Sequence, residues 1–354
     1  MKKTSKIMSL VLAGAMVLSM TACAGNTAET TSAAAKTQET AADTASKAEE
    51  TTGAEASESE TAAKAEGTTY KIGVLQLVQH TALDAANDGF IAALDDAGIA
   101  YEVDQQNASG DQSACQTVAS KFANEKKDLI LAIATPAAQA MVGAVEDTPV
   151  LITAVTDPAE SGLVDTNEKT GANVTGTSDL TPVKEQIDLL KQLVPEAKTV
   201  GVLYCSAESN SKIQADMAKE AIAAAGMESK EYTVSSSNEI QTVVQSMVGA
   251  VDAVYAPTDN VIAAGMATVG MVAGDNNLPV ICGEAGMVQN GGLATYGIDY
   301  YQLGYMTGQQ AVKILTEGAS PADMPIEYLP AEKCELTVNE ETAQTLGIDV
   351  SGLK

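Results

Sequence analysis

Short aliphatic runs alternate with longer amphipathic stretches from residue 70 to residue 155. The aliphatic runs are typical of buried strands, and the stretches between them repeat apolar residues at helical spacing. We expect strands at 70–77, 100–107, 128–134 and 149–155, and helices at 82–98, 110–126 and 136–145. Strands that alternate with helices indicate βαβ units, which build a parallel sheet with helices on both faces.

The same alternation restarts at residue 182 and continues to residue 318. Expected helices cover 182–195, 209–226, 237–249, 260–276 and 300–318, and expected strands cover 198–205, 228–234, 252–257, 278–283 and 292–298. This number of elements fits two α/β lobes in series better than one large sheet. We expect the chain to cross between the lobes near 177–181, 298–300 and 325–328. Lobe one would contain 70–180 and 299–325, and lobe two would contain 181–298 and 326–354.

Residues 1–22 have the pattern of an export signal. The basic start MKKTSK precedes an apolar stretch of 14 residues, which is shorter than the roughly 20 needed to span a bilayer. Small residues then precede Cys23 in MTACAG, which resembles a bacterial lipobox. This resemblance implies cleavage before Cys23, attachment of lipid to that residue, and a location on the extracytoplasmic face of the cell membrane. An ordinary signal peptide with an incidental cysteine is the alternative.

Residues 23–69 are expected to form a disordered tether between the lipid and the lobes. Ala, Thr, Glu, Ser and Lys dominate this segment after Cys23, and it has no aromatic residue and almost no large aliphatic one. Such a composition buries too little apolar surface to offset the conformational entropy that folding removes.

The composition argues against several classes of function. The formal net charge is -27, whereas nucleic-acid binding needs clustered Lys and Arg. A single His and the wide spacing of Cys115, Cys205, Cys282 and Cys334 argue against a metal site and favour free thiols. The chain has no phosphate-binding glycine motif and no GxSxG motif, so we expect neither a cofactor nor enzyme activity. The best enzyme interpretation is a racemase that uses Cys205 and Cys282, and it is weaker than that of a binding protein.

Polar residues gather directly after the expected strands. In open parallel sheets ligands bind at the carboxyl ends of the strands, and two facing lobes would bring two such edges together at one cleft. Helix N-termini there attract a carboxylate, and side-chain carboxylates attract an ammonium group, so this cleft predicts a site for an amino acid. The candidate ligand-binding residues are Gln76, His80, Thr135, Thr156, Asp157, Tyr204, Ser206, Asn210, Thr258, Asp259, Asn260, Glu284 and Asp299.

Roles can be assigned to several candidates. We expect Asp157 and Asp299 to bind the ammonium group, Thr135 and Ser206 to bind the carboxylate with nearby backbone N–H groups, and Gln76, His80 and Asn210 to shape the rim. Seven of the candidates also have a structural alternative. Thr135, Asp259, Asn260 and Asp299 could only cap helices, Asp157 could only form a turn, and His80 and Glu284 could only be solvated surface residues.

Several segments together resemble a known family. They are QLVQHTALDAANDGF, DLILAIATPAAQA, TAVTDPAESGLV, NVTGTSDLTPVKEQIDLL, VGVLYCSAESNS, YTVSSSNEIQ, VYAPTDN and ATYGIDYYQLGYMTGQQAVKIL. In this order they resemble the ABC-transporter substrate-binding lipoproteins of the tryptophan/tyrosine-binding type. The resemblance runs from about Tyr70 to Leu346. It implies the type I periplasmic-binding-protein fold, in which two Rossmann-like lobes with parallel sheets are joined by a three-crossing hinge. It also implies delivery of the ligand to a membrane permease that is driven by an ATPase subunit.

The resemblance favours an aromatic amino acid as the ligand, bound when the lobes close around it. The chain offers few rings to stack on such a ligand, and Tyr204, Tyr255, Tyr296 and Tyr300 are the candidates. A branched amino acid, a sugar or a nucleoside therefore remains an alternative ligand, and a sensor module for a membrane receptor remains an alternative role. Nothing in the sequence requires an oligomer, so we expect a monomer.

Overall fold

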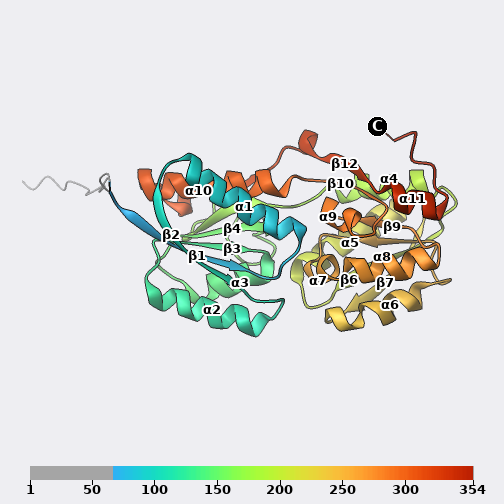
Figure 1. Cartoon of the computed structure of the whole chain (residues 1–354), viewed down its shortest axis with the longest axis horizontal. Coiled ribbons are helices and arrows are strands. Elements are labelled where there is room, and N and C mark those ends of the chain that lie inside the picture. The colour runs from blue at the N-terminus through green and yellow to red at the C-terminus, as the bar shows by residue number, and fades with distance from the viewer. Residues whose placement is uncertain (1–66, 354) are drawn as a thin grey trace, which may run out of the picture. The chain divides into compact units, whose positions relative to one another are not determined.

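The computed structural model describes residues 67–353, which contain two six-stranded sheets (Figure 1). The first sheet has the strand order β11-β5-β4-β3-β1-β2, and all its strand pairs are parallel. Its strands are β1 (Thr69–Gln76), β2 (Ala100–Asn107), β3 (Leu129–Ile133), β4 (Val150–Val155), β5 (Val174–Ser178) and β11 (Ile326–Tyr328). The helices of this lobe are α1 (Thr81–Asp96), α2 (Gln112–Glu125), α3 (Thr135–Ala144) and α10 (Tyr300–Glu317).

The second sheet has the order β12-β10-β9-β8-β6-β7, and only the β10–β12 pair is antiparallel. Its strands are β6 (Thr199–Cys205), β7 (Glu228–Val234), β8 (Ala253–Ala256), β9 (Val280–Cys282), β10 (Ala294–Gly297) and β12 (Glu335–Val338). Its helices are α4 (Val183–Leu193), α5 (Ser209–Ala224), α6 (Ile240–Met247), α7 (Asn260–Ala264), α8 (Met266–Asp275), α9 (Ala285–Gln289) and α11 (Glu340–Leu346). Short 3-10 turns cover Ser237–Glu239, Pro321–Asp323 and Ala331–Lys333.

The burial of each strand follows from its place in the sheet. Every residue of β3 and β4 is buried, because these central strands have helices on both faces and need aliphatic residues on each side. At the sheet edge, β2 is only partly buried and carries polar residues. Together the two lobes confirm the expected fold class of α/β lobes with mostly parallel sheets.

The end of the chain differs from the expected division into lobes. We placed 326–354 in lobe two, but β11 pairs with β5, where Ile326 lies opposite Gly176 in the first sheet. The third crossing therefore follows Tyr328 instead of preceding it. A three-residue strand with one buried side chain has no periodic signal, so only its pairing with β5 reveals it.

The two helices that begin beside the interlobe cleft, α1 and α10, pack closely over one face of the first sheet (Figure 1). A Cβ atom on Gly304 would lie 1.8 Å from the carbonyl oxygen of Ala86, and one on Gly89 would lie 2.0 Å from that of Tyr301. Further along, a Cβ on Gly308 would meet Ala93 and Phe90. Gly304 meets Ala86 and the later Gly308 meets the later Phe90, so α1 and α10 run parallel. Their N-termini, at His80 and Tyr300, both lie at the cleft.

The N-terminal predictions lie outside the described residues, apart from the last three positions of the expected tether. There β1 already begins at Thr69. Within 67–353, no helix combines the length and the apolar content that a bilayer crossing requires. In the same range Cys115, Cys205 and Cys282 are buried free thiols, and Cys334 is a partly buried one.

Candidate functional site

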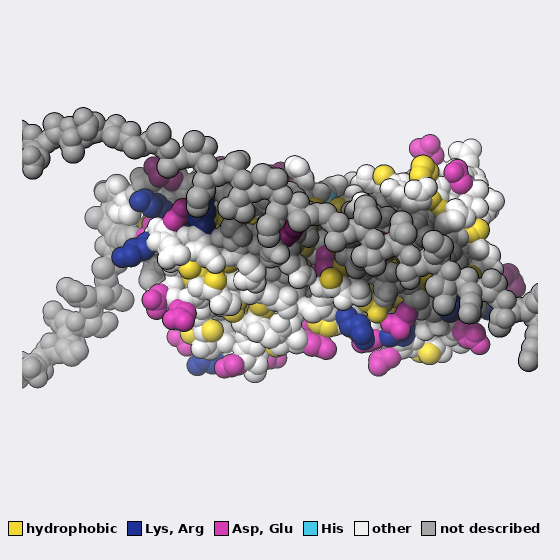
Figure 2. Space-filling model, turned by 90° about the horizontal axis from the view of Figure 1, so that it is seen from below, with side chains coloured by type: hydrophobic (Ala, Val, Ile, Leu, Met, Phe, Trp, Pro, Cys, Tyr) yellow, Lys and Arg dark blue, Asp and Glu magenta, His cyan; other side chains and the backbone are white. Residues whose placement is uncertain are grey.

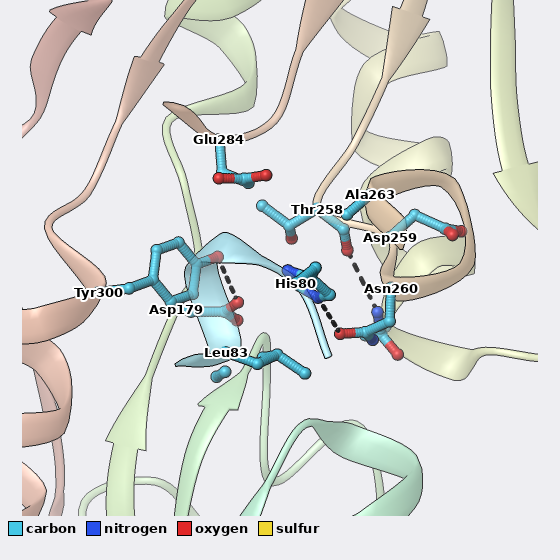
Figure 3. Close-up of a pocket in the computed structure, with 11 residues that line it drawn as sticks. His80, Leu83, Asp179, Thr258, Asp259, Asn260, Ala263, Glu284 and Tyr300 are labelled. Carbon is cyan, nitrogen blue, oxygen red and sulfur yellow. Dashed lines mark hydrogen bonds between the residues drawn. The ribbon is translucent and has the colours of Figure 1, made fainter. Parts of the chain in front are cut away.

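Residues from both lobes line a cavity in the cleft with about 270 Å³ of space between its atoms, part of which is open to solvent (Figure 3). Most of its polar residues follow the carboxyl end of a strand, as expected for a ligand site between two α/β lobes. The lining residues are His80, Leu83, Ala154, Asp179, Asn210, Thr258, Asp259, Asn260, Ala263, Glu284 and Tyr300. None of these described lining residues is Lys or Arg, although Lys side chains are visible among the acidic ones on the surface shown in Figure 2.

Asp179 follows β5 directly and is only 5% exposed. Its Oδ2 atom accepts a hydrogen bond of 2.8 Å from the hydroxyl of Tyr300, and its backbone N–H donates to the carbonyl of Val155. Its Oδ1 atom has no hydrogen-bond partner among the described residues. Burial raises the pKa of Asp179 to about 6, although the hydroxyl groups of Tyr300 and Thr156 oppose this shift. At neutral pH the cavity therefore contains a buried carboxylate, and its Oδ1 atom has no hydrogen bond from the described residues.

Glu284 contributes a second buried carboxyl group from lobe two. It is the N-cap residue of α9, and its oxygens accept from the backbone N–H groups of Gly286 and Met287 at 2.5 and 2.7 Å. Burial raises its pKa to about 7 despite these bonds, and the charge of Asp179 adds to the shift. Two buried carboxyl groups close together are costly to ionise. A cationic group bound at this end of the cavity would lower that cost.

His80 connects the lobes across the cavity. It is the N-cap residue of α1, and its Nε2 atom lies 3.3 Å from Oδ1 of Asn260 on α7. Asn260 in turn donates from Nδ2 to Oε2 of the buried Glu208 at 2.7 Å. Burial lowers the pKa of His80. Burial raises the pKa of Glu208, and the negative charge of the nearby Asp259 raises it further.

Other hydrogen bonds also cross the cleft. Nε2 of Gln214 donates to Oγ1 of Thr156 at 2.9 Å, and Nε2 of Gln112 donates to the carbonyl of Ala207 at 3.1 Å. These bonds join lobe one to α5 and to the loop before it, so the two lobes are in contact in a closed arrangement.

The backbone is strained near the ends of two strands of lobe one. Ala134 and Ala154 have φ angles of 83° and 54°, which residues with a Cβ atom seldom adopt. Ala154 lines the cavity, and Ala134 precedes α3. Strain of this kind persists where the surrounding structure holds the backbone in place, as it does at many ligand sites.

The structure brings six of the predicted residues to the cavity. They are His80, Asn210, Thr258, Asp259, Asn260 and Glu284. Three of these also cap helices, because Asp259 and Glu284 accept bonds from the N-termini of α7 and α9 and His80 precedes α1. Capping and a place in the cavity are therefore compatible.

The other seven predicted residues, Gln76, Thr135, Thr156, Asp157, Tyr204, Ser206 and Asp299, do not line this cavity. Asp299, expected to bind an ammonium group, is exposed and caps α10 through the N–H of Gln302. Asp157, the other expected partner of that group, forms a turn by accepting from the N–H of Glu160 and from Nδ2 of Asn167.

Four of the remaining five form hydrogen bonds elsewhere, and the fifth, Thr135, is buried with no hydrogen-bond partner for its hydroxyl among the described residues. Gln76 donates to Asp84, the hydroxyl of Tyr204 donates to Glu231, and the exposed Ser206 lies within hydrogen-bond distance of the carbonyl of Val234. Thr156 bonds to Gln214, and Thr135 is completely buried at the start of α3.

Two cavity residues had not been assigned polar roles. Asp179 was missed because β5 was not recognised as a strand, so the acid at its end had no context. Tyr300 was expected only as a ring, and its hydroxyl also fixes Asp179. Of the other candidate rings, the Tyr255 hydroxyl donates to Gln186 in the core of lobe two, and Tyr296 does not line the cavity.

The raised pKa values predict how pH affects the ligand-free protein. The folded pKa values of Asp179 and Glu284, about 6 and about 7, exceed the unfolded values near 4. The folded state then holds more protons in this range, so their contribution to stability is lost as pH rises through 6 and 7. We expect Asp179→Asn to gain about 1–3 kcal/mol over the wild type between pH 5 and pH 8. Urea unfolding at both pH values measures this gain, and an equal difference at each would contradict the prediction.

Within residues 67–353, no group of three or more His, Cys, Asp or Glu side chains is arranged to hold a metal ion. What the cavity offers is a set of carboxylate, amide and imidazole groups beside one aromatic ring. These groups can bind a small organic cation or zwitterion by hydrogen bonds and charge.

Comparisons with known proteins agree with this geometry. Residues 71–352 match the family described as ABC transporter substrate binding protein. The tyrosine-binding protein of Clostridioides difficile (strain R20291) is 41% identical over 352 residues, which cover 98% of this chain and 93% of that protein. A Streptococcus pneumoniae ABC domain in complex with L-Trp is 39% identical, with a TM-score of 0.78 over 80% of this chain and 97% of that one.

A third relative bears on the arrangement of the lobes. The ligand-free, open structure of a Clostridium difficile substrate-binding protein is 46% identical over 80% of this chain and 97% of that one, yet its TM-score is 0.62. A lower score at a higher identity indicates a different lobe arrangement, and the hydrogen bonds across the cleft indicate that the present one is closed. The match to the family spans nearly all the described residues. The chain therefore belongs to the family of ABC transporter substrate-binding proteins, which bind solutes for transport and are not enzymes.

Proposed function

We propose that this protein binds an aromatic amino acid, tyrosine or tryptophan, in the interlobe cavity and delivers it to an ABC permease. The observation that carries the proposal is the buried Asp179, whose Oδ1 has no partner among the described residues in a cavity that they line without Lys or Arg. An ammonium group is the partner that such an oxygen lacks. The tyrosine-binding and L-Trp-bound relatives support an aromatic side chain.

The cavity has groups that would contact both the charged groups and the aromatic side chain of such a ligand. Asp179 would pair with the α-ammonium group, and the ring of Tyr300 with the side chain of Leu83 would contact the aromatic group. Because the described lining has no cationic side chain of Lys or Arg, the ligand carboxylate would be bound by neutral donors such as hydroxyl and backbone N–H groups. Closure of the lobes would then make contacts that the open form lacks, and the permease would receive the closed, loaded form.

Ligand titration tests the proposal directly. The chain has no Trp, so excitation of its Tyr residues with detection of ligand emission reports L-tryptophan binding by energy transfer. Calorimetry reports L-tyrosine. We expect saturable binding of at least one of the two, with a blue-shifted emission for a buried indole. Binding of a branched amino acid but of neither aromatic one would overturn the aromatic assignment.

We further propose that Cys23 carries lipid and holds the protein on the extracytoplasmic face of the cell membrane. The basic start, the short apolar stretch and the small residues before Cys23 support this location. We expect Cys23→Ser to abolish incorporation of labelled palmitate and to release the protein from membranes. Cys334→Ser, which changes a partly buried thiol, is the matched control and should keep the label. A labelled Cys23→Ser protein would contradict the anchor.

A further inference from the structure

Three polar atoms of the cavity lining have no hydrogen-bond partner among the described residues. They are Nδ1 of His80, Oδ1 of Asp179 and Oδ1 of Asn210, so they come from both lobes. Leaving a buried polar atom unpaired is costly, and three in one ligand cavity indicate groups that the ligand satisfies. Whether each atom is a hydrogen-bond donor or an acceptor then determines which ligand groups can bond to it.

The hydrogen bonds of Asn260 determine its orientation. Burial raises the pKa of Glu208, which favours the protonated form of this carboxyl group. Its Oε2 atom lies 3.2 Å from the backbone N–H of Asn260 and 3.3 Å from Nδ2 of Asn210, which both donate, so any proton is on Oε1 and Oε2 is an acceptor. The side-chain atom of Asn260 that lies 2.7 Å from the same oxygen must therefore be the NH₂ group. Its Oδ1 atom consequently faces the imidazole ring of His80 and can only accept.

This orientation fixes the tautomer of His80. Because Oδ1 of Asn260 accepts, Nε2 of His80 must carry the hydrogen and donate. Burial lowers the pKa of His80, so the ring is neutral and Nδ1 carries no hydrogen. In the view of Figure 3, the ring lies between Asn260 on one side and Asp179 with Tyr300 on the other. Nδ1 is thus an acceptor within the cavity.

The amide of Asn210 is oriented in the same way. Its Nδ2 atom lies 3.3 Å from Oε2 of Glu208 and 3.3 Å from the backbone carbonyl oxygen of Thr258, and both of these oxygens accept. Its free Oδ1 atom is therefore also an acceptor. All three unpaired atoms of the lining, the carboxylate oxygen of Asp179 included, can receive a hydrogen and none can give one.

We propose that His80 is a ligand-binding residue whose neutral Nδ1 accepts a hydrogen bond from the ligand's ammonium group, together with Oδ1 of Asp179 and Oδ1 of Asn210. An ammonium group has three donors and no acceptor, which matches three acceptors, whereas a carboxylate would leave all of them unpaired. Asn260 and Glu208 are positioning residues that hold His80 in the accepting tautomer. This inference rests on the proposed function, since it names the part of the amino acid that this cluster recognises.

This cluster of acceptors would make the site specific for ligands that carry an amino group. A site built to bond an N–H group rejects an analogue without it far more strongly than a site that is only apolar. We therefore expect 3-(4-hydroxyphenyl)propionate, which is L-tyrosine without its amino group, to bind at least about a thousandfold more weakly than L-tyrosine.

NMR of the imidazole nitrogens tests the tautomer, because His80 is the only histidine of the chain. With ¹⁵N-histidine label, the ligand-free protein should show a protonated Nε2 and an unprotonated Nδ1. Saturating L-tyrosine should shift the Nδ1 signal, as a new hydrogen bond to that atom does, and the deaminated analogue should not. A protonated Nδ1 in the free protein, or an unchanged Nδ1 signal while calorimetry shows L-tyrosine bound, would overturn the inference alone.

Two further results separate the possible failures. A shift with L-tyrosine that L-phenylalanine does not reproduce when it is bound would assign the donor to the phenol hydroxyl and overturn the ammonium assignment. If calorimetry shows that neither L-tyrosine nor L-tryptophan binds, the proposed function itself fails, and this inference fails with it.

Asn260→Leu tests the positioning role. This substitution removes the acceptor for Nε2, so we expect a mixture of His80 tautomers and an affinity for L-tyrosine lower by about tenfold or more. The matched control is Asn276→Leu, because Asn276 is exposed at the end of α8 and should leave both the spectrum and the affinity unchanged. A single Nε2–H tautomer in folded Asn260→Leu would show that Asn260 does not position the ring. The wild-type spectrum decides the main inference whether or not this variant folds.

Discussion

Asp179→Asn is expected to weaken the binding of L-tyrosine or L-tryptophan by about 2–5 kcal/mol, roughly 30-fold to 5,000-fold in Kd. The substitution keeps the shape of the side chain but replaces a buried carboxylate with a neutral amide. The α-ammonium group of the ligand would then be buried without its counter-charge. Tyr300 could still donate to the amide oxygen, so the wall of the cavity should remain in place. Calorimetric titration of both proteins at pH 7.5 measures the loss.

Asp299→Asn is the matched control for this experiment. Asp299 was the acid that the sequence favoured for the ammonium group, but it is exposed, lies outside the cavity lining and caps α10. Because Asn is as good a capping residue as Asp, we expect a change in affinity below about 1 kcal/mol. A larger loss in Asp299→Asn than in Asp179→Asn would reverse the assignment of the two acids.

The two substitutions also differ in their expected effects on the ligand-free protein. Asp179 is ionised in a buried place without a cationic partner among the described residues, so its removal should stabilise the empty protein above pH 6. Binding and stability would then change in opposite directions, as is common where a binding site stores unfavourable interactions. A substitution that merely damaged the fold would lower both.

The fold could be predicted from sequence where pattern and packing agree. The aliphatic run of β3 lies in the middle of its sheet. Asp111 caps α2, as expected for an aspartate that directly precedes a helix. The pattern fails for β5, whose residues VTGTS are all buried although three are polar. The hydroxyls of Thr153, Thr177 and Thr307 bond to one another there, so this burial depends on contacts between distant parts of the chain.

Contacts between distant parts of the chain also decide which acidic residues reach the site. Asp259, Glu284 and Asp299 all cap helices that follow a strand or a strand-end loop, and nothing in their local sequence separates them. Two of them line the interlobe cavity and the third is exposed, because what lies opposite each cap is determined by the arrangement of the lobes. The sequence could therefore indicate a strand-end site for a zwitterion, but it could not select which acid would contact the ligand.

Gly304→Ala is expected to lower the free energy of unfolding by about 1–3 kcal/mol, because the new Cβ would overlap the carbonyl of Ala86 on the neighbouring helix. The helices α1 and α10 would have to separate. Since His80 precedes α1 and Tyr300 begins α10, the separation would also move these two residues apart at the cavity. We therefore expect weaker ligand binding as well as lower stability, measured by urea unfolding and by calorimetry on the same preparations.

Gly274→Ala provides the control for this loss. Gly274 lies in α8, has no atom near the position of an added Cβ, and has an ordinary helical place in the chain. Replacing it with Ala should be neutral or stabilising by up to about 1 kcal/mol, through helix propensity alone. If Gly304→Ala matched this control in stability, the close packing of α1 and α10 would not be needed for the fold. If Gly304→Ala lost stability but kept full affinity, the two helices would not hold His80 and Tyr300 in register at the cavity.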